Sequence, residues 1–400
     1  HSHTVGWYTS LYPVKLELSS GIGFSIKSIK ENIRSIPNKG IGFGSFVLDE
    51  QNTLGFDQLP LICFNYLGQF GDKKIKDWQL TLESSGVSVS KNNMNRYLIH
   101  INGLVVNGQM TFYITSKLGE SLTKCFAKNF LSYLDEVLHY CLEIISNQSE
   151  EYTSSDFMGL EISQTLLNKL QRKARDNNAI ETIYLANSLQ QGFIYHALSQ
   201  GDADAYRVQL SFDYHQALDV DKYIQSWEMA IKCFPILRAA FNWEDGIYQI
   251  VYKEGLLNYQ LHDISALKLE SERNQRISSI QAVDRNINFD LTQPSLLRLH
   301  IIKQSEEHYT IIKTEHHSIS DGWSSAILLQ YVQTVYEQLK RNITLNIIPD
   351  KAYGLAQEYY ISHENQVKQY WKRKLEEFNQ INNLNPLLSC QVDLNKIRSL

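Results

Sequence analysis

The sequence has 400 residues, enough for two or three domains with buried cores. Hydrophobic residues make up 43% and charged residues 20%, which excludes a wholly disordered chain. The net charge of −5 gives no electrostatic reason to expect a nucleic acid or an anionic membrane as partner. No apolar run approaches the roughly 20 residues that a membrane-spanning helix needs.

The start of the chain and its cysteines bear on its origin. It begins His1-Ser2-His3 and its first methionine is Met94, so we expect a piece of a longer polypeptide. The 5 cysteines include no Cys-x-x-Cys pair, which disfavours a disulfide framework or a zinc ribbon. A reducing cytoplasm is therefore the expected location.

Residues 1–146 are predicted to form a mixed α/β lobe. Runs rich in aromatic and β-branched residues predict strands over 5–18, 59–67, 78–85, 96–105 and 109–115. Apolar residues at helical spacing predict helices over 25–36 and 120–145. Residues 147–160 begin with a polar, Ser/Glu-rich stretch and are predicted to be a linker.

Residues 161–378 are predicted to form a second lobe of the same α/β class. Helices are predicted over 163–175, 188–199, 219–234, 269–284 and 321–339, with Asp219 or Asp221 as a cap of the third. Strands are predicted over 206–214, 237–241, 247–252, 296–302 and 309–314. Residues 379–400 are interpreted as the start of a connection to a further lobe. The fold class is thus α/β, specifically an α+β two-layer sandwich in two lobes.

The sharpest chemical feature is the sequence His-His-Ser-Ile-Ser-Asp-Gly over residues 316–322. It follows a predicted strand and precedes a predicted helix, so a tight loop presents two imidazoles. Imidazole exchanges protons near neutral pH, and an amine that attacks an acyl carbon needs a group to take its proton. Asp321 can hold the loop by pairing with a cation or can cap the helix, and Gly322 leaves room for a substrate.

Two other chemistries fit this loop less well. A metal site would need a third ligand beside His317 and Asp321, and none stands at plausible spacing, so no metal is expected. A serine hydrolase would need a Gly-x-Ser-x-Gly elbow, but Gly322-Trp323-Ser324-Ser325-Ala326 ends in alanine.

The His-His-x-x-x-Asp-Gly pattern resembles the signature of condensation domains of nonribosomal peptide synthetases, which are relatives of chloramphenicol acetyltransferase. Residues 187–196 resemble that family's first core motif, in the form typical of a D-configured donor, through Gln190, Gly192 and His196. Residues 235–241 resemble the second motif, whose Leu-Arg-x-x-Phe includes Arg238.

The first segment resembles a related epimerization domain instead. Residues 4–13, 36–44 and 64–70 are similar to three of its motifs in the family's order, and 153–157 resembles the linker that follows. The order implies the C-terminal lobe of an epimerization domain, then the N-terminal lobe of a condensation domain. A circularly permuted single domain is the alternative.

The resemblance implies roles for individual residues. His317 would be catalytic, as a general base or as a group that positions the amine. His316, Asp321, Gly322 and Arg238 would be structural, with Asp321 paired to Arg238. The candidates for lining a substrate tunnel are Gln190, Gly192, His196 and Trp323. The candidates in the epimerization lobe are Trp7, Asn65 and Tyr66, although core packing is the expected role of Trp7 and Tyr66.

The resemblance also implies partners. The intact enzyme would join a carrier-bound D-configured peptidyl or aminoacyl thioester to a carrier-bound amine. The 4′-phosphopantetheine would arrive on carrier domains, beside adenylation domains and the remaining lobes, with no cofactor bound directly. The isolated 400 residues are expected to be inactive in condensation and in epimerization. A freestanding acyltransferase that uses acyl-CoA and a non-catalytic carrier-docking scaffold are the alternative functions.

Overall fold

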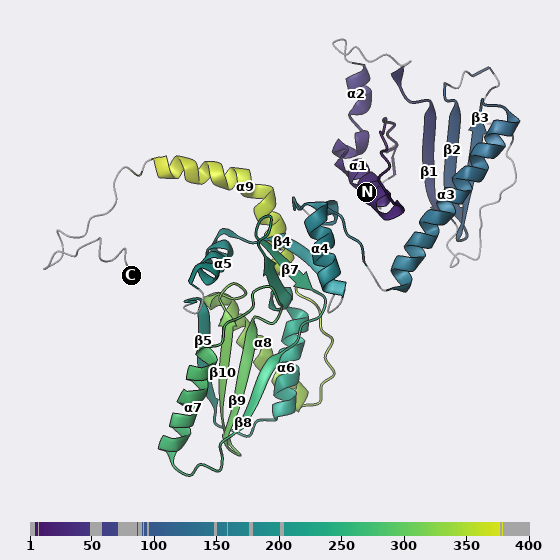
Figure 1. Ribbon diagram of the computed structural model, residues 1–400. Coiled ribbons are helices and arrows are strands. Elements are labelled where there is room, and N and C mark those ends of the chain that lie inside the picture. The colour runs from purple at the N-terminus through teal and green to yellow at the C-terminus, as the bar shows by residue number, and fades with distance from the viewer. Residues whose placement is uncertain are drawn as a thin grey trace. The chain divides into compact units, whose positions relative to one another are not determined.

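The structure is a computed structural model that describes residues 5–378 apart from 7, 49–57, 71–85, 87–89, 91, 94–95, 148–149, 158, 176–178, 201–203 and 377. The chain divides into two compact units, His1–Ser155 and Asp156–Leu400, hereafter the first and second units. Both combine helices with sheets (Figure 1), so the expected α/β class is confirmed. Among the described residues, no helix is long and apolar enough to cross a bilayer.

The first unit contains a sheet of order β1-β2-β3 in its described part. β1 (Ile62–Phe70) runs parallel to β2 (Ile99–Val106), which forms an antiparallel hairpin with β3 (Gln109–Ser116). The hairpin turns at Asn107-Gly108, where both residues have positive φ, as an Asn-Gly turn requires. The long helix α3 (Glu120–Ser146) packs Phe130 edge-on against Phe112 of β3 with ring centroids 5.0 Å apart.

The helices of the first unit follow the sequence pattern better than its first predicted strand does. α1 (Ile22–Ser35) and α3 confirm the two predicted helices; η1 (Pro37–Gly40) and α2 (Phe43–Val47) follow α1. The strand predicted over 5–18 is wrong, because its described residues have no regular structure. Side chains hold it instead: Ser10 donates to Lys39 O over 2.8 Å and Asn32 to Lys15 O over 2.9 Å. The strand predicted over 78–85 lies outside the described residues.

The second unit is built on a sheet of order β5-β10-β9-β8 (Figure 1). β10 (His308–His316) pairs antiparallel with both β5 (Arg207–Tyr214) and β9 (Leu297–Ser305), and β8 (Asn258–Asp263) runs parallel to β9. β10 is therefore an inner strand, held by a neighbour on each side.

Helices cover both faces of this sheet. α6 (Val220–Cys233) and α8 (Gly322–Lys340) bury Trp227 and Tyr336 against Leu299 and Ile311 on one face. α7 (Glu270–Arg285) packs Ile280 on the other face. Because alternate residues of a strand face opposite sides, β10 contributes to both cores.

A smaller sheet of order β4-β7-β6 completes the second unit. Its strands are β4 (Ile180–Leu185), β6 (Ala239–Asn242) and β7 (Tyr248–Tyr252). The other helices described for this unit are α4 (Gln164–Arg175), α5 (Ser188–Gln200), η5 (Pro235–Arg238) and α9 (Ala352–Glu376), and η3 (Ser154–Asp156) lies at the boundary between the units. All five helices predicted for this region are confirmed to within two residues at each end, whereas β4 and β8 are strands that the sequence pattern did not predict.

Candidate active site

The backbone of the two adjacent histidines is fixed by both neighbouring strands. His316 ends β10, and its N–H donates to Leu296 O over 3.0 Å. The N–H of His317 donates to Tyr206 O over 2.8 Å on the other side. The chain then turns through residues 317–321 into α8. The loop therefore begins from a strand held on two sides, which fixes where both imidazoles start.

The hydrogen bonds of His317 fix its tautomer. Nδ1 lies 2.5 Å from the carbonyl oxygen of Ser320, and a carbonyl can only accept, so Nδ1 carries the proton. In the neutral imidazole, Nε2 then keeps its lone pair. The ring of Phe193, from α5, stacks on the imidazole with centroids 5.2 Å apart and planes 11° apart, which fixes its orientation. His317 thus presents a base of fixed direction.

His316 has the opposite tautomer and no access to solvent. The N–H of Ser318 donates to His316 Nδ1 over 3.2 Å, so that nitrogen accepts and the proton belongs on Nε2. Nε2 lies 3.2 Å from Asp204 Oδ2. Burial lowers the pKa of His316, although the charge of Asp204 acts to raise it. The His316 side chain, at 0% exposure, cannot meet a substrate and instead anchors the loop.

Asp321 caps α8 and forms no ion pair with the residues that the structure describes. Its Oδ1 accepts from Ser324 N over 2.7 Å and from Ser324 Oγ over 2.6 Å. These hydrogen bonds, with the hydroxyl first, lower the pKa of Asp321. A Cβ added at Gly322 would meet no atom within 4 Å, so the described chain does not itself require glycine there.

The expected pair of Asp321 with Arg238 is wrong. Arg238 is buried, and its Nη2 donates to Glu181 Oε2 over 2.7 Å. Its Nε donates to Tyr252 O over 2.9 Å, and Nη1 to Ile231 O over 3.2 Å. With these groups bound, Arg238 joins η5 to the small sheet and takes no part in holding the histidine loop.

Gln190 reaches the histidine loop from the first turn of α5. Asn187 and Gln190 form a reciprocal capping box, in which each side chain accepts the other's backbone N–H, over 2.9 and 3.0 Å. The Gln190 amide then donates to Ser318 O over 2.9 Å and to Gln249 Oε1 over 3.2 Å. Gln249 Oε1 also accepts from the Tyr353 hydroxyl of α9. Gln190, predicted as a tunnel residue, is thus a buried support of the loop.

The other predicted tunnel residues do not converge. Gly192 is exposed on α5, and Trp323, at the start of α8, is 87% exposed. His196 is half-buried, with its ring edge-on to Tyr206 and its Nδ1 3.8 Å from Asp204 Oδ1. None of the three lines the cavity described below.

The first-unit candidates lie on β1 or outside the described residues. Asn65 is exposed, and its Nδ2 donates to Asn102 Oδ1 of β2 over 3.2 Å. Tyr66 follows it on the opposite face and is 50% exposed, so the expected core role is wrong for Tyr66. Trp7 lies outside the described residues.

Sequence reasoning missed several partners of the loop. Phe193 lies inside the first motif, and its stacking on His317 has no sequence signal of its own. Asp204 follows the end of α5 and is recognisable only once the fold brings it to His316.

On β10, Lys313 and Glu315 form a buried ion pair 2.7 Å long, and Lys313 Nζ also donates to Ser325 of α8 over 2.9 Å. Their two-residue spacing was the available signal.

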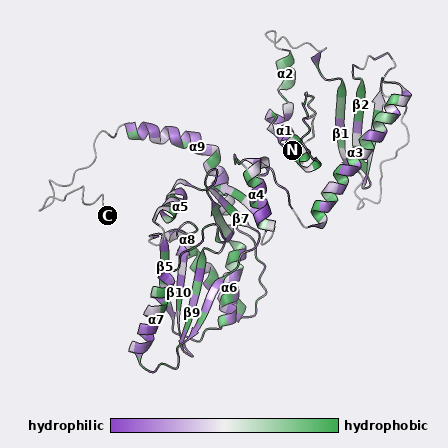
Figure 2. Cartoon of the chain, viewed as in Figure 1, coloured by the Kyte–Doolittle hydropathy of each residue, from purple (hydrophilic) through white to green (hydrophobic). Residues whose placement is uncertain are grey.

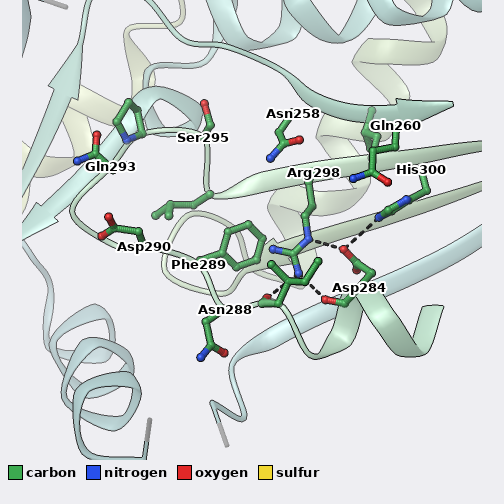
Figure 3. A pocket seen from close by; sticks show the side chains of 14 residues that line it. Asn258, Gln260, Asp284, Asn288, Phe289, Asp290, Gln293, Ser295, Arg298 and His300 are labelled. Atoms are coloured by element: carbon green, nitrogen blue, oxygen red, sulfur yellow. Dashed lines mark hydrogen bonds and ion pairs between the residues drawn. The ribbon is translucent and has the colours of Figure 1, made fainter. Parts of the chain in front are cut away.

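A cavity of about 340 Å³ lies beside the α7 face of the sheet (Figure 3). Asp284, at the end of α7, forms one wall and accepts from Arg298, His300 and Thr314. Burial alone would raise the pKa of Asp284, but these hydrogen bonds outweigh it and hold the pKa well below its usual range. Arg298 stacks over Phe289 at 4.2 Å. This network joins α7 to β9 and β10, so we interpret it as a support of the strand that carries the histidines.

The chain is similar to known proteins over most of its length. The family model described as Condensation domain matches residues 1–157 and 180–396. A mycosubtilin synthase protein of Bacillus subtilis is 31% identical over 350 residues, which cover 85% of this chain and 13% of that protein. A linear gramicidin synthase protein of Brevibacillus parabrevis is 29% identical over 396 residues, 94% of this chain and 8% of that protein. The chain therefore spans a small part of these relatives. The solved starter condensation domain of rhizomide synthetase is 17% identical, with a TM-score of 0.44, over 50% of this chain and 52% of that one.

Proposed function

Because the chain belongs to the condensation-domain family, we propose that its second unit supplies the base for amide-bond formation in a nonribosomal peptide synthetase. The observation that carries the proposal is the tautomer of His317, whose Nδ1 is engaged by Ser320 O and whose Nε2 keeps its lone pair. The reaction joins the thioester of an upstream carrier-bound donor to the amine of a downstream carrier-bound acceptor.

In the proposed reaction, this one imidazole takes up a proton and later returns it. The amine nitrogen attacks the thioester carbonyl, a C–N bond forms, and a proton passes from nitrogen to His317 Nε2. The C–S bond then breaks, and the departing thiolate takes that proton. While His317 is cationic, Ser320 O accepts a charge-assisted hydrogen bond from Nδ1. The thiol belongs to 4′-phosphopantetheine on the donor's carrier.

The test is His317→Ala in a synthetase module that contains the chain. Product formation from two loaded carriers should fall by about 10²–10⁴-fold, the usual contribution of a positioned base. His363→Ala, on α9, is the matched control and should leave the rate unchanged. An unchanged rate in His317→Ala would favour the scaffold function instead.

The donor is proposed to be D-configured, because residues 187–196 take the form typical of such domains. The module should use a carrier loaded with a D-donor faster than the same carrier loaded with the L-donor. A preference for the L-donor would reject this assignment while leaving the role of His317 intact.

Residues 1–146 are proposed to be the C-terminal lobe of an epimerization domain, joined by a linker over 147–160 to the condensation lobe over 161–378, with 379–400 leading to the next lobe. The order of the three epimerization-type motifs supports this. Asn65→Ala should lower the D:L ratio of carrier-bound intermediate, while condensation of a supplied D-donor stays constant. Loss of both activities together would contradict two separate sites.

The partners proposed are carrier and adenylation domains of the same synthetase, in the cytoplasm, and the chain alone is proposed to be inactive. The relatives are synthase proteins much longer than this chain, which supports this setting. The alternative, a freestanding acyltransferase, predicts that the purified chain transfers an acyl group from acyl-CoA to an amine. Turnover with acyl-CoA and none with loaded carriers would favour it.

A further inference from the structure

A second group of potential ligands lies at the far end of β10 from the histidine loop. β5 ends at Tyr214, which pairs with Tyr309, the second residue of β10. Figure 1 shows β5 and β10 side by side. Over the 9 residues of β10, a strand spans about 26 Å. This group is thus separate from the site at His316 and His317.

Strand register brings three potential metal ligands together. Tyr309 pairs with Tyr214 and Thr310 with Asp213, so His308 stands opposite His215. The alternation of side chains places Asp213, His215 and His308 on one face. Their ligand atoms all lie within 4.8 Å of one another. His308 Nε2 is 3.8 Å from Asp213 Oδ1, and the two imidazole centroids are 4.7 Å apart.

The carboxylate of this group is held in place from behind. The buried hydroxyl of Thr310 donates to Asp213 Oδ1 over 2.5 Å, and Gln304 Nε2 donates to Thr310 Oγ1 over 2.8 Å. The Gln304 amide also lies 3.3 Å from His308 Nε2. The hydrogen bond from Thr310 orients the Asp213 carboxylate, as outer partners of metal ligands do, whereas a metal at His308 Nε2 would displace the Gln304 amide.

A second histidine pair in the same unit is bound by other protein side chains, which makes it a useful contrast. His262 Nε2 lies 3.0 Å from His300 Nδ1, and His300 Nε2 faces Asp284 at 3.1 Å. Arg298 already neutralises that carboxylate, so the pair is closed by protein groups. Asp213 has no such arginine in the described ion pairs, and its side chain is 46% exposed.

We propose that Asp213, His215 and His308 bind one divalent transition-metal ion of the zinc class. Two imidazoles and one carboxylate suit zinc, copper or nickel, whereas magnesium and calcium prefer oxygen ligands alone. Three protein ligands leave a coordination position for water. The ion joins β5 to the β9–β10 hairpin, and it takes no part in chemistry at His317, because the site lies at the opposite end of β10.

The experiment is a calorimetric titration of the 400-residue chain with zinc chloride at neutral pH. His1 and His3 also offer imidazoles, so a background carrying His1→Ala and His3→Ala removes them from the titration. One zinc ion should bind, and His215→Ala and His308→Ala should each weaken binding by about tenfold or more. His139→Ala, exposed on α3, is the matched control and should bind as the background does.

Two further readouts keep the proposal open to refutation if one variant folds poorly. Zinc should raise the melting temperature of the background but not of His308→Ala, because a ligand that binds only the folded state stabilises it. Thr310→Val, which keeps all three ligands, should weaken binding less than His215→Ala does. Absence of saturable binding, or equal affinity in the ligand variants and the background, would overturn the proposal. The condensation rate plays no part in these tests.

Discussion

The two units of the molecule bury their apolar residues very differently. In the described part of the first unit, the buried hydrophobic side chains are Ile99 and Ile101 of β2. Ile62 and Phe64 of β1 are 55% and 57% exposed, and Leu142 of α3 is 62% exposed. The second unit instead encloses Trp227 and Tyr336 completely. Figure 2 shows apolar residues on strands of both units, so hydropathy along the chain does not by itself make a core.

The difference follows from how many layers cover each sheet. The large sheet of the second unit has α6 and α8 on one face and α7 on the other, so its inner strands meet side chains on both sides. In the first unit, β1 pairs only with β2 in the described structure, and residues on both faces of β1 are exposed. A site that depends on rigid positioning is therefore expected in the second unit, and His317 lies there.

The largest expected effect comes from a direct test of the two cores. Trp227→Ala should destabilise the second unit by about 3–5 kcal/mol, because it empties a fully enclosed aromatic site. Phe64→Ala in the first unit should cost less than about 1 kcal/mol, since much of its ring is already exposed. Urea unfolding of each variant measures both values. Equal losses would break the comparison.

Removal of Asp284 should have the next largest effect. Asp284→Ala leaves Arg298 buried without its partner and should cost about 3 kcal/mol. The pKa of Asp284 is depressed in the folded state, so its stabilising contribution is present above the unfolded pKa of about 3.9 and is lost as pH falls through the lower folded value. Stability measured from pH 6 downwards should fall less steeply below about pH 4 in the variant. A variant with the parent's acid slope would contradict this role.

Gln190 tests whether the loop depends on its support from α5. Gln190→Leu removes the donor to Ser318 O and should cost about 1–3 kcal/mol, because a buried carbonyl loses its partner. The rate of product formation in the module should also fall, while the binding of loaded carriers stays constant. Gln191→Leu, the neighbouring residue that donates to Ala186 O, is the control. Normal turnover in Gln190→Leu would show that the loop holds its position without α5.

The smallest expected effect belongs to Asp321. Asp321→Ala removes a helix cap and should cost about 0.5–2 kcal/mol. Asp321→Ser keeps a capping oxygen without the charge and should restore most of that stability. Thermal melts of both variants measure the difference. If the serine variant were as unstable as the alanine variant, the charge rather than the cap would be the stabilising feature.

Local patterns predicted the helices and most strands because their signals lie within a few residues. The cap at Asp219, which accepts from Lys222 N, was one of two predicted positions. The turn at Asn107-Gly108 has the same local origin. Strand 5–18 failed because a strand exists only where a partner pairs with it, and that information is not local.

The candidate site was predictable in its centre and not around it. The motif located the two histidines and Asp321. The partner expected for Asp321 was wrong, because Arg238 donates its hydrogen bonds to Glu181 and to backbone carbonyls. Phe193 and Asp204 reach the loop from other elements, and Gln249 supports Gln190 behind it. Their contacts depend on how sheets and helices pack, which sequence spacing does not contain.

The two adjacent histidines carry one last consequence. Although both residues are histidine, Nδ1 of His316 accepts a hydrogen bond and Nδ1 of His317 donates one. Nitrogen-15 spectra should therefore resolve two distinct imidazole spin systems at neutral pH, one for each tautomer. The two identical side chains therefore have different roles, since His316 anchors the loop and His317 presents Nε2, because different partner groups surround each ring.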